Sequence, residues 1–152
     1  MDNTNTPNNA DIIESLKAVP DIRKRLIFAV LALVSVFAPI ASASAFGFTA
    51  SVSVAEILGN FAYVLPILGI LVVVAPIVPA LQANTRIIDM ANGAAALFAT
   101  FMLLNTVFEA VKFAGRASEL ATPSWGLLVF VVYLWFAVAR AFRAVRSRPV
   151  TA

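Results

Sequence analysis

The sequence contains no cysteine and no histidine, and only 12% of its 152 residues are charged. Without those two residue types the chain cannot form a disulfide, a thiolate or imidazole metal site, a cysteine nucleophile or a histidine-based triad. The phosphate-binding patterns G-x-x-x-x-G-K-[ST] and G-x-G-x-x-G are also missing. Most familiar catalytic designs are therefore excluded, and we expect no enzyme activity, no cofactor and no metal site.

Apolar residues dominate the chain instead. They make up 61% of the sequence, and the mean hydropathy is +0.92. They gather in four long stretches, at about 26–45, 57–81, 87–113 and 125–142. A spanning helix needs roughly 20 apolar residues, and a helix satisfies its own backbone where no water is available. The sequence therefore predicts an all-α membrane protein with a bundle of four transmembrane helices.

The segment before the first stretch, residues 1–25, is expected to be a disordered tail followed by a short amphipathic helix. Its first ten residues have little apolar surface to bury. From Asp11 the apolar residues recur at helical spacing, and Pro20 should end that helix. The apolar face could lie on the membrane surface, which we favour, or it could dock on a partner.

The first apolar stretch allows two interpretations. It follows a basic cluster, Arg23 to Arg25, and ends in the small-residue run Ala-Ser-Ala-Ser-Ala at 41–45. This order is also typical of a secretory signal peptide with a cleavage site after Ala45. We favour a retained spanning helix, because the polar region before the cluster is long for a signal peptide. In both cases Phe46 lies outside the cytoplasm.

Local signals mark the second stretch. Apolar and polar residues alternate over 46–55, which indicates a short extended segment at the outer interface. Ser53 and Glu56 then form the S-x-x-E pattern of a capping box, which predicts a helix start. Pro66 cannot donate to the carbonyl of Ala62, so we expect a kink there.

The third stretch carries two features of interest. Small residues recur every four positions at Ala91, Ala95 and Ala99, which predicts a ridge for close helix packing. A candidate polar cluster follows near the outer end, formed by Asn105, Glu109 and Lys112 on one helix face. We expect Glu109 and Lys112 to form a structural ion pair, although an ionisable group within a span is also a functional candidate.

The fourth stretch ends in basic residues and a basic tail, 143–152. We expect Arg140, Arg143, Arg146 and Arg148 to contact the headgroups of anionic lipids on the cytoplasmic side. With both termini cytoplasmic, nine of the eleven basic residues lie on that side, as the positive-inside rule requires. A bacterial plasma membrane is the default location, and the charges form no separate nucleic-acid-binding domain.

Two functions fit these features. The leading hypothesis is a non-enzymatic scaffold or accessory subunit of a membrane complex, which binds other membrane proteins or its own copies. Its contact surfaces would be the alanine ridge and the aromatic residues of the fourth stretch, Phe130, Tyr133, Trp135 and Phe136. The alternative is a small transporter or channel-like assembly that uses the kinked second helix and the polar face of the third.

Overall fold

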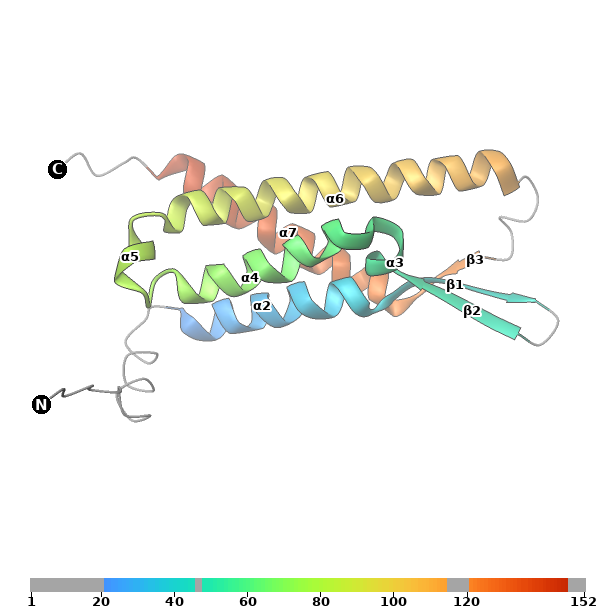
Figure 1. Cartoon of the computed structure of the whole chain (residues 1–152), viewed down its shortest axis with the longest axis horizontal. Helices are drawn as coiled ribbons and strands as arrows, with labels where there is room; N and C mark the ends of the chain where they lie inside the picture. The colour runs from blue at the N-terminus through green and yellow to red at the C-terminus, as the bar shows by residue number, and fades with distance from the viewer. Residues whose placement is uncertain (1–20, 46–47, 115–120, 148–152) are drawn as a thin grey trace, which may run out of the picture.

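The structure, a computed structural model, describes residues 21–45, 48–114 and 121–147. The predicted amphipathic helix before Pro20 and Arg148 of the basic tail lie outside these residues. Within them the fold is mostly helical, with a small sheet at one end (Figure 1). In chain order the elements are α2 (Ile22–Phe37), β1 (Pro39–Ala45), β2 (Phe48–Ser53), α3 (Val54–Leu58), the 3-10 helix η1 (Gly59–Tyr63), α4 (Val64–Val74), α5 (Pro79–Gln82), α6 (Thr85–Ala114), β3 (Ala121–Pro123) and α7 (Trp125–Arg146).

Three helical segments of the described chain are long and apolar enough to cross a membrane. They are Val54–Val74, which joins α3, η1 and α4, then Thr85–Thr106 within α6, and Trp125–Arg146. The second, third and fourth predicted stretches correspond to these segments. α6 and α7 begin within two residues of the predicted positions, and α7 continues four residues past its predicted end.

The first predicted span differs from the structure. Its helix, α2, has 16 residues and ends at Phe37, eight residues before the predicted end. Ala38 is extended because it precedes Pro39, and a residue before proline is pushed out of the helical region. The small residues that follow form β1, so the Ala-Ser-Ala-Ser-Ala run is a strand and not the end of a spanning helix.

The sheet was not predicted, apart from the extended segment that became β2. Its strand order is β2-β1-β3, and both pairings are antiparallel. β1 and β2 are neighbours in sequence, whereas β3 joins from 80 residues away, with Ser42 paired to Thr122. The Ser42 and Thr122 hydroxyls lie 3.3 Å apart. The sheet therefore ties the end of α2 to the start of α7.

The capping box at the start of the second span is confirmed. The Glu56 backbone N–H donates to the Ser53 hydroxyl, and the Ser53 backbone N–H donates to the Glu56 carboxylate at 2.6 Å. Helical geometry then changes twice, at Gly59, which has a positive φ of 54°, and at Val64 where α4 begins. Pro66 is the third residue of α4, a position where its missing N–H costs little. The irregularity thus precedes Pro66, and the predicted kink at Pro66 itself stays a prediction.

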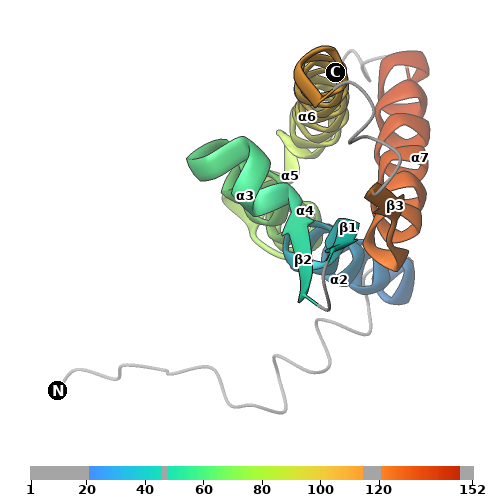
Figure 2. The same cartoon turned by 90° about the vertical axis from the view of Figure 1, so that its right-hand side faces the viewer.

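Small residues let the helices pack closely around a narrow core. Viewed along the bundle, α2, α4, α6 and α7 surround this core (Figure 2). A Cβ atom on Gly69 of α4 would lie 2.8 Å from the Cβ of Ala32 on α2, so no larger side chain fits there. Gly93 of α6 lies even more tightly against Ala141 of α7. The buried side chains include Phe28, Ala32, Val36, Leu65, Val72, Ala96, Ala99, Leu103, Phe130, Tyr133 and Ala137.

Candidate functional site

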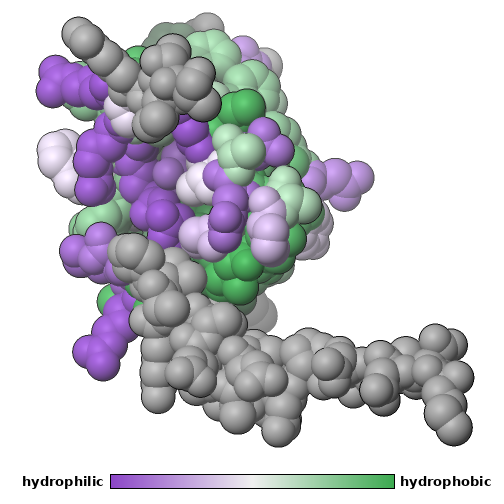
Figure 3. All heavy atoms as spheres, turned by 90° about the vertical axis from the view of Figure 1, so that its left-hand side faces the viewer, coloured by the Kyte–Doolittle hydropathy of each residue, from purple (hydrophilic) through white to green (hydrophobic). Residues whose placement is uncertain are grey.

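Four arginines gather at the end of the bundle opposite the sheet. The starts of α2 and α6 lie at this end together with the ends of α4 and α7 (Figure 1). These elements bring Arg25, Arg86, Arg140 and Arg143 to the lining of one pocket. We refer to this as the arginine end. Hydrophilic side chains gather on it, with hydrophobic side chains beside them (Figure 3).

The centre of the arginine end is an ion pair between α6 and α7. Arg140 donates from Nε and from an Nη atom to one oxygen of Asp89, at 3.1 and 2.9 Å, and the same Nη atom lies 3.2 Å from the second oxygen. The Arg140 guanidinium also lies 5.6 Å from the centre of the Phe28 ring on α2. Both charged side chains are mostly buried, at 16% and 15% exposed. The pair therefore links three helices in a place where water screens it poorly.

Two further arginines bond to backbone carbonyls across the bundle. Arg25 of α2 donates to the carbonyl of Val72 at 2.8 Å, and Arg86 of α6 donates to the carbonyl of Val145 at 3.3 Å. The Nε atoms of both guanidinium groups are buried and have no hydrogen-bond partner among the described residues. Buried donors are nearly always satisfied in proteins, so these two donors mark a place where an acceptor could bind.

The pocket between these side chains has a volume of about 370 Å³. Ligand pockets commonly start at roughly 300 Å³, so a small group fits. Its lining holds four arginines against two carboxylates, Asp21 and Asp89, a balance of plus two. Asp89 is occupied by Arg140, and Asp21 is held by Lys24 at 2.8 Å. The hydrogen bond from Lys24 lowers the pKa of Asp21 below its usual range, so that carboxylate stays charged. The pocket therefore suits an anion.

A second polar contact lies one helical turn from Asp89 towards the middle of the bundle. The Tyr133 hydroxyl of α7 donates to the side-chain oxygen of Asn92 on α6 at 2.9 Å. Both side chains are fully buried, and the amide nitrogen of Asn92 has no partner among the described residues. Beyond this pair the same interface is apolar, with Ala96, Ala99 and Phe130. The two polar contacts, Asp89 with Arg140 and Asn92 with Tyr133, thus occupy only the half of the α6/α7 interface nearest the arginine end.

Two members of the predicted polar cluster near the other end of α6 have described side chains. Asn105 and Glu109 are both exposed. The Lys112 side chain lies outside the described part, so the predicted ion pair with Glu109 stays a prediction. In Figure 1 this part of α6 extends past α3 and α4. Among the side chains that the structure describes, charged residues come together at the start of α6.

The predicted alanine ridge is divided between the core and the surface. Ala99 is fully buried, Ala95 is half-buried, and Ala91 is exposed. The buried stripe of α6 runs instead through Asn92, Ala96, Ala99 and Leu103. The prediction that the ridge is a packing surface is not tested for a partner outside this chain.

The four arginines predicted to contact lipid headgroups have different environments. Arg140 is held by Asp89, whereas Arg143 and Arg146 are exposed in the last turn of α7. The Arg146 guanidinium lies 4.2 Å from the centre of the Phe142 ring, outside the pocket. Arg148 lies outside the described residues.

Sequence reasoning missed Asp89, Asn92 and Arg86 as site residues. Two spacings could have found the first two. Asp89 and Asn92 lie three residues apart and so share a face of an apolar helix, while Tyr133 and Arg140 lie seven apart, two turns of one face of the next helix. When two such helices pack side by side and antiparallel, the polar residues of one can be expected to contact those of the other.

No protein-family model, no curated protein and no solved structure matches this chain.

Proposed function

We propose that this protein is a multi-pass membrane protein that acts as a non-enzymatic subunit, in contact with other membrane proteins or with copies of itself. Its surface supports a membrane location. The exposed side chains include 25 large hydrophobic residues, spread over α2, η1, α4, α6 and α7. A monomeric soluble protein rarely exposes so much contiguous apolar surface. Lipid or a protein partner must therefore cover it.

The proposal includes α2 as a fourth span, with the arginine end facing the cytoplasm. At about 1.5 Å per residue its 16 residues cover about 24 Å, less than the roughly 30 Å of hydrocarbon. Local thinning of the bilayer can accommodate such a mismatch at modest cost. Exposed apolar residues along α2, such as Ile27, Val30 and Leu33, support contact with lipid. The positive-inside rule supports the orientation, in a plasma membrane of bacterial type.

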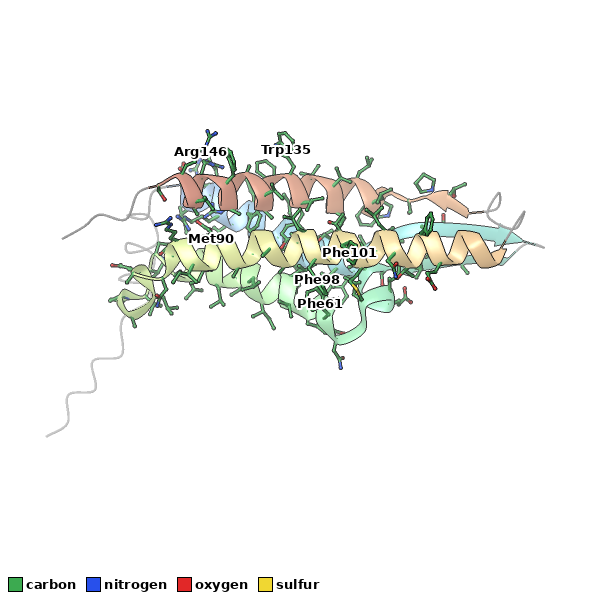
Figure 4. The ribbon with its side chains drawn as sticks, turned by 90° about the horizontal axis from the view of Figure 1, so that it is seen from above. Phe61, Met90, Phe98, Phe101, Trp135 and Arg146 are labelled. Atoms are coloured by element: carbon green, nitrogen blue, oxygen red, sulfur yellow. The ribbon has the colours of Figure 1, made fainter. Side chains whose placement is uncertain are left out.

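Trp135 is the observation that carries the subunit role. It is ten residues into α7, about 15 Å along the helix, and its side chain is 75% exposed. It points away from the bundle (Figure 4). Tryptophan is usually found at the membrane interface, where its indole N–H meets polar groups. Here the N–H has no hydrogen-bond partner among the described residues, and the surrounding lipid would offer none. A neighbouring protein helix would supply one.

The burial of the three candidate spans agrees with this role. Only 22% of the α7 span is buried within the chain, against 33% for each of the other two. Leu128, Val131, Trp135 and Phe142 recur on its outward side at spacings near 3.6 residues. α7 therefore offers the most free surface, and we assign the contact with a partner to this face.

The test compares two exposed aromatic residues. Trp135→Leu keeps an apolar side chain but removes the indole, while Phe101→Leu makes a similar change on α6 at a side chain 65% exposed. Copies labelled at an introduced cysteine are reconstituted in vesicles, and energy transfer between them is measured against dilution with lipid. We expect Trp135→Leu to reduce association and Phe101→Leu to leave it unchanged. Binding to other membrane proteins is compared in the same way, by pull-down of the two variants from the host membrane. Equal behaviour of both variants in both assays would refute the assignment.

A small transporter remains the second candidate, because polar side chains lie inside the bundle at Asp89, Asn92, Tyr133 and Arg140. Intramembrane polar groups often mark solute or proton pathways. The apolar packing of Ala96, Ala99 and Phe130 beyond them argues against an open path. Flux of protons, ions or solutes in vesicles, lost in a folded Asn92→Leu variant, would replace the subunit proposal with this one.

A further inference from the structure

Two cavities meet at the arginine end. The first is the basic pocket of about 370 Å³. The second, about 170 Å³, lies between α2 and α7 and is lined by the apolar side chains Ile27, Phe28, Leu31 and Phe136. Asp21, Arg140 and Arg143 line both cavities, so the two adjoin. A polar site thus continues into an apolar groove along the outside of the bundle.

The groove opens on the surface assigned to lipid. Ile27 is exposed on α2 and Phe136 is exposed on α7, while Phe28 at the base is buried under the Arg140 guanidinium. The groove runs from the charged end towards the middle of the two helices, since its residues lie from Lys24 to Leu31 on α2. An acyl chain that follows the groove would keep its headgroup beside the arginines.

The charge of the basic pocket determines the kind of headgroup. Arg25, Arg86 and Arg143 form no salt bridge with a carboxylate of the described chain, and each donates only to a backbone carbonyl. Two of them keep a buried, unpartnered Nε–H. Guanidinium groups match the oxygens of a phosphate in geometry and charge.

We propose that the two cavities form one binding site for an anionic phospholipid, with its phosphate among Arg25, Arg86 and Arg143 and one acyl chain in the α2/α7 groove. Arg140 is a positioning residue at the junction, fixed by Asp89. The inference uses the membrane placement proposed above but not the subunit role. A soluble phosphate compound shares the headgroup chemistry, so the test must separate the two sources.

The test uses the full chain in mild detergent and native mass spectrometry. Phosphatidylglycerol and phosphatidylcholine with the same acyl chains are titrated, and glycerol phosphate is added as a headgroup without a tail. We expect a discrete site that prefers phosphatidylglycerol and that glycerol phosphate displaces poorly. Equal binding of the two lipids would overturn the proposal, and full displacement by glycerol phosphate would show a site for a soluble anion.

Matched variants locate the site. Arg143→Gln should weaken phosphatidylglycerol binding about tenfold, the effect of one lost charge-assisted hydrogen bond. Arg146→Gln removes the same charge one turn away, outside both cavities, and should change binding by about twofold or less. Leu31→Trp should block the groove, whereas Leu33→Trp adds the same bulk on the exposed side of α2. If both variants of either pair lost the same lipid affinity, the lipid would bind by non-specific attraction and the proposed site would be refuted. Because the lipid-binding measurement does not depend on Trp135, failure of the lipid-site proposal can be distinguished from failure of the subunit role.

Discussion

Asp89 and Arg140 form an ion pair across α6 and α7 at 2.9 Å, with both side chains mostly buried. Asp89→Ala should therefore lower stability by about 2 kcal/mol or more, because it leaves the Arg140 charge without its partner in a poorly hydrated place. The control is Lys24→Ala, which breaks the exposed pair with Asp21 and should cost clearly less than Asp89→Ala. Melting of both variants in the same detergent gives the comparison.

The reverse experiment removes both charges. Asp89→Leu combined with Arg140→Met should recover much of the stability that Asp89→Ala loses, because replacing a buried pair by apolar side chains is often neutral. If the double variant is as unstable as the single one, the loss arises from packing and not from the uncompensated charge.

The helices that were predicted correctly are those whose position is determined by residues close together in the sequence. α6 and α7 follow from long apolar runs, and the start of α3 follows from the contact between Ser53 and Glu56, three residues apart. The end of α2 was missed although Pro39 marks it, because an apolar run was read as one uninterrupted helix. Apolar length alone does not locate the end of a helix.

The sheet and the charged site depend on contacts that are distant in sequence. β1 pairs with β3 across 80 residues, and Asp89 meets Arg140 across 51. A single sequence contains the candidate residues but not their pairing. Glu109 drew attention because it is an acid near Lys112, whereas the mostly buried pair of Asp89 and Arg140 joins two helices.

Substitution of the alanines of α6 tests which side of the helix packs. Ala99→Leu should destabilise the protein by about 1–3 kcal/mol, because its position is fully buried. Ala91→Leu should cost little, because Ala91 is exposed and lipid is as apolar as leucine. Thermal unfolding in detergent ranks the variants, with Ala95→Leu expected between them. A cost at Ala91 that appears only in the membrane would indicate a partner helix on that face.

The orientation can be tested with cysteines, because the chain has none of its own. Asn84→Cys places a thiol in the exposed turn near the arginine end, and Ser51→Cys places one in β2 at the sheet end. A membrane-impermeant maleimide added to intact cells should label Ser51→Cys only, and both after the membrane is opened. Labelling of Asn84→Cys in intact cells would reverse the proposed orientation. The mass of the purified chain tests cleavage after Ala45 in the same preparation.

A last comparison concerns two glutamates in different settings. Glu56→Ala removes half of a capping box and should lower the stability more than Glu109→Ala does, because the Ser53 backbone N–H at the helix N-terminus loses its partner. Glu109→Ala should cost about 0.5 kcal/mol or less, because its side chain is exposed and a surface pair with Lys112, three residues on, would contribute no more than that. Both variants are compared by thermal unfolding. A larger loss at Glu109 would mean that its carboxylate is held by more than a surface pair, and flux measurements on Glu109→Gln would then decide whether the transporter alternative deserves preference over the subunit role.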